Sequence, residues 1–169
     1  FFGPVLPFVL ELSYLLVYVI GTFCVVLLYV SREQRKTETF LFPLLLGTFL
    51  SYVLFPFFPS EPPRTVFPNE DLPAYRPVIR EFTHWLLGHY GIHTSVFPSA
   101  HVSSAFSAAF GMLPLTRNLP AVRYGLFLLA SLIAVATVYG RYHYLVDAVA
   151  GLAVAVTAWA VTCWLNRRR

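Results

Sequence analysis

Three ionisable residues, His101, His143 and Asp147, interrupt long apolar stretches of the chain. Ionisable side chains at membrane depth are costly, so each is a candidate for a functional site. His143 and Asp147 are four residues apart and would share one face of a helix. The carboxylate could then accept a hydrogen bond from one imidazole nitrogen, leaving the other nitrogen free as a nucleophile or base.

Neighbouring residues predict an anion site beside these side chains. Pro98 suits the first position of a helix, and the N–H groups of that helix start, with the Ser99 hydroxyl, would favour an anion. Arg64 and Arg141 could add bidentate contacts to a phosphate. Two histidines, an orienting carboxylate and an anion cradle together indicate phosphoryl transfer through a covalent histidine.

The composition places this chemistry in a membrane. Of 169 residues, 57% are hydrophobic and 12% are charged, and the mean hydropathy is +0.66. A soluble domain carries about 25% charged residues, so a soluble globule, a disordered chain and a disulfide scaffold are all excluded. The net charge of +4 is too small and scattered to indicate a nucleic-acid partner. The predicted fold class is an all-α integral membrane protein.

Five apolar segments approach the roughly 20 residues that a spanning helix needs. They are residues 12–30, 40–57, 98–115, 121–139 and 144–165. The third and fifth are rich in Ala, Ser and Gly, which let helix backbones approach closely, so we expect them to be the inner helices. Residues 1–169 are then a single transmembrane catalytic domain.

Basic residues set the predicted orientation. Lys and Arg cluster in residues 31–39 and 116–123 and in the C-terminal tail. Five spans put these stretches on one side, which the positive-inside rule makes cytoplasmic, together with the C-terminus. The polar ends of the third and fifth spans then lie on the extracytoplasmic side.

The long outer loop, residues 58–97, is predicted to contain an interfacial helix over roughly 75–90. Its apolar residues recur at helical spacing, which is typical of an amphipathic helix in the headgroup layer. Glu11, near the outer start of the first span, is expected to be interfacial as well. The predicted apolar residues of the helix are Ile79, Phe82, Leu86 and Tyr90, and the polar ones are Arg76, Arg80, Thr83 and His84.

Two short motifs resemble those of one enzyme family. Residues 97–101, Phe-Pro-Ser-Ala-His, resemble the second signature, Pro-Ser-Gly-His, of the type 2 phosphatidic acid phosphatase superfamily. Residues 142–147 are similar to the end of its third signature, His-x-x-x-Asp. The resemblance covers most of the chain, because that family is a bundle of about six helices, and it implies a sixth helix before Phe1.

The resemblance also implies roles for individual residues. His143 would form a phosphohistidine, Asp147 would orient it, and His101 would protonate the leaving oxygen and later activate water. Ser99 and Ala100, which stands where the family has Gly, would contact the phosphate. No metal and no cofactor are implied.

The phosphate-binding arginines depart from the family's pattern. Thr137 occupies the position of the third-signature arginine, so Arg141 is assigned by proximity only. The first signature, Lys-x6-Arg-Pro, has no literal match. The segment Pro62-Pro63-Arg64 resembles a variant in the phosphotransferase branch that makes phosphosphingolipids, whereas Arg76 is followed by proline as in the signature. We assign Arg64, because it lies close behind the second span.

The predicted function is hydrolysis of a membrane lipid phosphate or polyprenyl diphosphate. The alternative is transfer of a phospho-headgroup to a lipid hydroxyl, as in inositol phosphorylceramide synthase, and the shared site chemistry does not separate the two. A zinc hydrolase is a second class, in which His84, His89 and His93 join the three central residues as possible ligands. A transporter with a proton relay is a third, although no inverted repeat is visible and the polar residues gather at one end.

Overall fold

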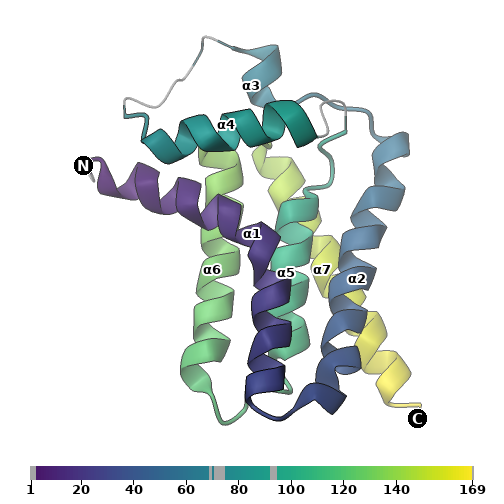
Figure 1. The fold of residues 1–169 in the computed structure, drawn as a ribbon. Helices are drawn as coiled ribbons and strands as arrows, with labels where there is room; N and C mark the ends of the chain where they lie inside the picture. The colour runs from purple at the N-terminus through teal and green to yellow at the C-terminus, as the bar shows by residue number, and fades with distance from the viewer. Residues whose placement is uncertain (1–2, 69, 71–74, 92–94, 169) are drawn as a thin grey trace.

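The computed structural model describes residues 3–68, 70, 75–91 and 95–168. Within them all the regular elements are helices, besides one isolated bridge between Ser60 and Ser95, and this confirms the predicted all-α class. Short 3₁₀ turns, Gln34–Lys36 and Phe55–Phe57, flank the second helix. The helices are α1 Val5–Val30, α2 Thr37–Leu54, α3 Pro63–Val66, α4 Val78–Tyr90, α5 Ala100–Met112, α6 Pro120–Tyr139 and α7 Leu145–Asn166 (Figure 1).

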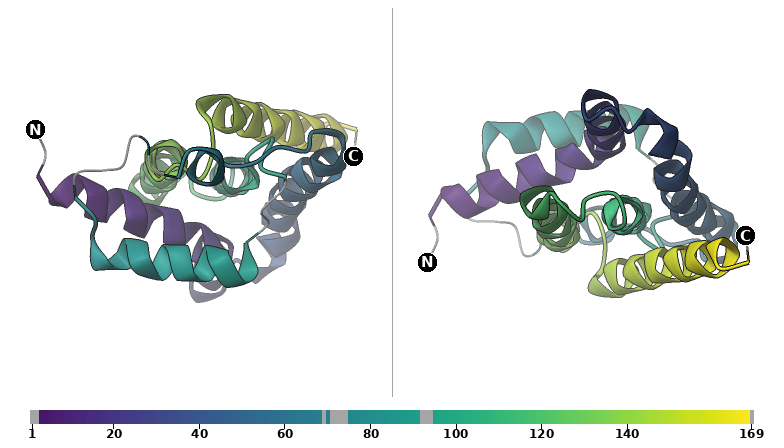
Figure 2. Two further views of the ribbon diagram at one scale, coloured as in Figure 1. Left: turned by 90° about the horizontal axis from the view of Figure 1, so that it is seen from above. Right: turned by 90° about the horizontal axis from the view of Figure 1, so that it is seen from below.

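The bundle is arranged around α5, which packs against α1, α2, α6 and α7 (Figure 1). At one end α4 lies across the bundle, beside the first half of the bent helix α1 (Figure 2). The α1–α2 and α5–α6 connections and the C-terminus lie together at the opposite end. The three basic stretches of the sequence therefore share one end of the molecule.

Within the described ranges, four helical segments are long and apolar enough to cross a membrane: Val5–Val30, Gln34–Phe57, Pro120–Tyr139 and Leu145–Asn166. The predicted third span, residues 98–115, contains α5, whose 13 residues lie in the middle of the bundle. The helix is shorter than the predicted segment because the chain is extended at Ser99 and turns after Met112. The aliphatic and aromatic side chains exposed along the outside of the long helices fit an integral membrane protein.

Helix α7 is peripheral, although its small residues predicted an inner position. Gly151 and Ala155 are buried, whereas Val149 and Val156 on the same helix are exposed. Small residues thus form one packed face of α7, and apolar residues suited to lipid form the other.

Helix α4 lies within the predicted range 75–90. Two of the polar residues predicted for it, Arg80 and Thr83, are buried against the bundle together with Leu87. Phe82 and Trp85 are exposed on the other side, where aromatic side chains suit a lipid interface. Arg80 can be buried because the bundle offers it an anionic partner.

A glycine on α7 permits the close approach of α5 that brings the site together. A Cβ atom at Gly151 would lie 2.5 Å from the carbonyl oxygen of Ser99 and 3.1 Å from the Cβ atom of Val102. Gly151→Ala is therefore expected to lower the free energy of unfolding by about 1–3 kcal/mol, measured by unfolding in detergent micelles. Gly125→Ala in α6, where nothing lies within 4 Å of the added atom, is the control and should not destabilise. Equal stability of the two variants would contradict this view of the α5–α7 contact.

Candidate active site

Two histidines from distant parts of the chain face one cavity. His101 lies in the first turn of α5, and His143 lies in the turn between α6 and α7. Their ring centroids are 5.7 Å apart and their planes meet at 61°. Both line a cavity of about 290 Å³, whose wall also includes Arg64 and Ala100. The structure thus brings together side chains that the sequence separates by 42 positions.

A tight turn fixes the backbone at His143. The N–H groups of Tyr142 and His143 both donate to the carbonyl oxygen of Thr137, at 2.9 and 3.0 Å. The Asp147 carboxylate accepts the N–H of Tyr144 at 2.8 Å and lies 3.5 Å from Nδ1 of His143. That separation suits an ion pair with a protonated ring and is longer than a direct hydrogen bond. Asp147 therefore sits beside Nδ1, and Nε2 is the ring nitrogen left for chemistry.

Two tyrosines of α1 hold His101. The Tyr14 ring stacks on the imidazole at 4.9 Å between centroids, and the Tyr18 hydroxyl lies 3.2 Å from Nε2. The direction of that hydrogen bond depends on the tautomer of the ring. Sequence reasoning missed both tyrosines, although their spacing of four residues puts them on one face of a helix.

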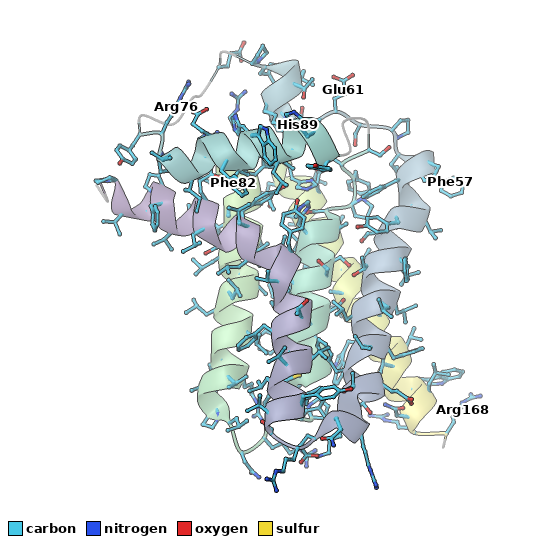
Figure 3. All side chains as sticks on the ribbon, viewed as in Figure 1. Phe57, Glu61, Arg76, Phe82, His89 and Arg168 are labelled. Carbon is cyan, nitrogen blue, oxygen red and sulfur yellow. The ribbon has the colours of Figure 1, made fainter. Side chains whose placement is uncertain are left out.

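Arg64 reaches the cavity and Arg76 does not. The guanidinium carbon of Arg64 lies 5.5 Å from the centroid of the Tyr142 ring, within range of a cation–π contact. Arg76 is exposed before the start of α4 and is absent from the residues that line the cavity (Figure 3). Of the two candidates for the first-signature arginine, only Arg64 has this position.

Arg141 supports the segment that carries Arg64. Its Nη2 atom donates to the carbonyl oxygens of Pro63, at 3.2 Å, and Phe67. Its own carbonyl oxygen accepts the N–H of Arg64 at 3.1 Å, and its backbone has a φ of 63°. The guanidinium thus faces the backbone of α3, and a direct contact with phosphate stays a prediction.

Ser99 and Ala100 lie at the start of α5. The Ser99 side chain is fully buried, and its hydroxyl oxygen accepts the N–H of Val102 at 3.4 Å, capping the helix. Ala100 forms part of the cavity wall, as does Ser104, which sequence reasoning missed. In this arrangement Ser99 supports the helix start, and the first turn of α5 faces the cavity.

The remaining histidines have other surroundings. Burial, followed by the charges of Arg80 and Arg64, lowers the pKa of His84, so this ring is neutral at physiological pH. His89 bonds the carbonyl oxygen of Trp85, and the zinc candidate His93 lies outside the described residues. Across the part of the chain that the structure describes, no group of three His, Cys, Asp or Glu side chains is placed to hold a metal ion.

Comparisons with known proteins bear on the family and the fold of the chain. A sequence model of the PAP2 superfamily matches residues 3–161. The crystal structure of Aquifex aeolicus LpxE is similar, with a TM-score of 0.68 and 20% sequence identity, covering 95% of this chain and 87% of LpxE. At that identity the likeness shows a shared fold. No curated protein matches the chain by sequence.

Proposed function

The chain belongs to the PAP2 superfamily, and we propose that it is a membrane-embedded phosphatase acting on a lipid phosphate or polyprenyl diphosphate through a phosphohistidine. The observation that carries the proposal is the approach of His101 and His143 to 5.7 Å on the wall of a cavity that also contains Arg64. Phosphoryl transfer requires a nucleophile, a proton donor and a cation beside the phosphate. In this proposal they are His143, His101 and Arg64, which line the same cavity.

The proposed reaction has two steps. Nε2 of His143 attacks phosphorus, the bond from phosphorus to the lipid oxygen breaks, and that oxygen takes a proton from His101. His101 then removes a proton from water, the resulting hydroxide attacks phosphorus, and the phosphorus–nitrogen bond breaks to release phosphate. Asp147, 3.5 Å from Nδ1, stabilises the charge that His143 acquires, and Arg64 stabilises the charge on the phosphate oxygens.

A neighbouring apolar groove supports a lipid substrate. The groove has a volume of about 450 Å³ and lies between α1 and α4. It shares Tyr18, Tyr90 and Gly91 with the cavity, and its other lining residues are Leu15, Phe82 and Leu86. A phosphate head in the cavity and an apolar tail in the groove fit one amphiphilic molecule.

The proposed orientation places the cavity on the extracytoplasmic side. The cavity lies at the α4 end of the bundle, whereas the loop with Arg35 and Lys36, the loop with Arg117 and the C-terminus lie at the other end. The positive-inside rule then supports a cytoplasmic C-terminus.

The test uses the purified chain in lipid nanodiscs with phosphatidate, a sphingoid phosphate and a polyprenyl diphosphate, read by phosphate release. We expect release from at least one lipid, unchanged in excess chelator. Release that is lost in chelator and restored by zinc would contradict the phosphohistidine mechanism. A parallel reaction with a lipid alcohol separates the alternative, because a transferase would form a new phospholipid and little free phosphate.

A further inference from the structure

A buried ion pair lies behind the site and has no role in the two proposed steps. Nη1 of Arg80 in α4 lies 2.7 Å from Oε1 of Glu11 in α1, and the two side chains are 4% and 2% exposed. The expectation that Glu11 is interfacial is therefore wrong. Burying two charges carries a large desolvation penalty, and an apolar pair of similar volume is often at least as stable. Fold stability alone is thus a weak explanation for this pair.

Both partners also bond the turn that ends at His143. The Tyr142 hydroxyl donates to Oε2 of Glu11 at 2.8 Å, and Nη2 of Arg80 donates to the carbonyl oxygen of Gly140 at 3.2 Å. Tyr142 directly precedes His143 in the chain, and Gly140 lies three residues before it. The ion pair is therefore hydrogen-bonded to the turn at two residues, Gly140 and Tyr142.

The same tyrosine leads to the second histidine. The Tyr142 ring packs on Tyr14 at 4.3 Å between centroids, and Tyr14 stacks on His101 at 4.9 Å. Tyr142 is 1% exposed and lies over Gly140, where an added Cβ atom would meet its ring at 2.2 Å. The buried side chain of Tyr142, which precedes His143 in the chain, is thus connected through the Tyr14 ring with the ring of His101.

We propose that Glu11 and Arg80 are positioning residues that set the separation of the two catalytic imidazoles by holding Gly140 and Tyr142. The inference rests on the proposed phosphatase function. Reacting groups held in a near-attack geometry lose about 100-fold in rate for a displacement of about 1 Å. The pair should therefore act on turnover more than on substrate binding.

The test uses the double variant Glu11→Leu/Arg80→Met to distinguish an effect on the placement of the histidines from an effect on folding. The variant removes both charges and both hydrogen bonds to the turn. We expect the protein to stay folded, with a thermal unfolding temperature somewhat below that of the wild type because the Tyr142 hydroxyl and the Gly140 carbonyl each lose a partner. We expect kcat to fall by about 10- to 100-fold and KM to change by less than about twofold. The matched control is Glu33→Leu/Lys36→Met, which removes a half-exposed ion pair of 2.9 Å far from the site and should leave kcat unchanged. Wild-type kcat in the Glu11/Arg80 double variant would overturn the proposal.

Tyr142→Phe keeps the test decisive if the double variant does not fold. This change removes one hydroxyl and keeps the ring between Gly140 and Tyr14, so we expect kcat to fall by about fivefold or more at constant KM. Unchanged kcat, or a fall accompanied by a rise in KM of similar size, would overturn the proposal. A wild-type protein without phosphatase activity would instead contradict the proposed function, so the two failures are distinct.

Discussion

Replacing His143 by alanine is expected to lower phosphate release by about 10⁴- to 10⁶-fold, the range seen when a covalent nucleophile is removed. In the proposed mechanism His143 provides the nitrogen that bonds phosphorus. The neighbouring imidazole of His101 cannot take over this role, because Tyr14 and Tyr18 hold it in another position. A water molecule in the alanine variant would lack both the nucleophilicity of imidazole and the pairing with Asp147.

The measurement combines steady-state phosphate release with acid or base quenching of enzyme mixed with radiolabelled lipid phosphate. Wild-type protein should retain label that is stable in base and labile in acid, as expected of a phosphorus–nitrogen bond, and His143→Ala should retain none. His89→Ala is the matched control, since His89 is exposed on α4 and is not among the residues that line the cavity. Its contacts are with its neighbours Trp85 and Tyr90 on the same helix. Equal labelling of wild type and His143→Ala would assign the nucleophile elsewhere.

Arg64→Met is expected to reduce kcat/KM by about 10²- to 10³-fold, the loss typical of removing one preorganised donor from a developing negative charge. Arg64 reaches the cavity from α3, packed over the Tyr142 ring, and the backbone of its segment is fixed by Arg141. Arg64→Lys should recover part of the loss, because an ammonium restores the charge without the bidentate geometry of a guanidinium.

Arg76→Met is the control for this prediction. Arg76 is exposed before α4, away from the cavity, and its removal should change kcat/KM by less than about twofold. Substrate titrations of the three arginine variants provide the comparison. A larger loss from Arg76→Met than from Arg64→Met would identify Arg76 as the phosphate-binding arginine of the first signature.

The sequence was most informative where residue type and local spacing carry the chemistry. His101, His143 and Asp147 stand out because ionisable groups are rare in apolar segments. Asp147 lies 3.5 Å from Nδ1 of His143, although His143 is in the turn before α7 and the two residues do not share the helix face that their spacing predicted. The gathering of the basic stretches at one end of the bundle was also predictable, because it follows from the order of the helices along the chain. These inferences need no knowledge of how the helices pack.

Local sequence patterns could not predict which residues from distant segments of the chain contact one another. Glu11 and Arg80 are 69 residues apart, and each alone resembles an ordinary surface charge. Their pairing buries the Arg80 side of α4 against the bundle, and a helical period by itself does not reveal such a contact. Ser99 shows the same limit, because its hydroxyl could equally cap α5 or contact an anion, and only the packing of α5 against α7 buries it.

Under the proposed function, the apolar groove between α1 and α4 would let the substrate arrive from within the membrane. Because the groove joins the cavity at Tyr18 and Tyr90, a lipid with its tail in that groove would meet His101 and His143 after lateral diffusion within the leaflet. The encounter frequency would then be governed by the mole fraction of substrate in the membrane surface, and its aqueous concentration would be secondary. Dilution with inert lipid at a fixed total amount of substrate slows such an enzyme.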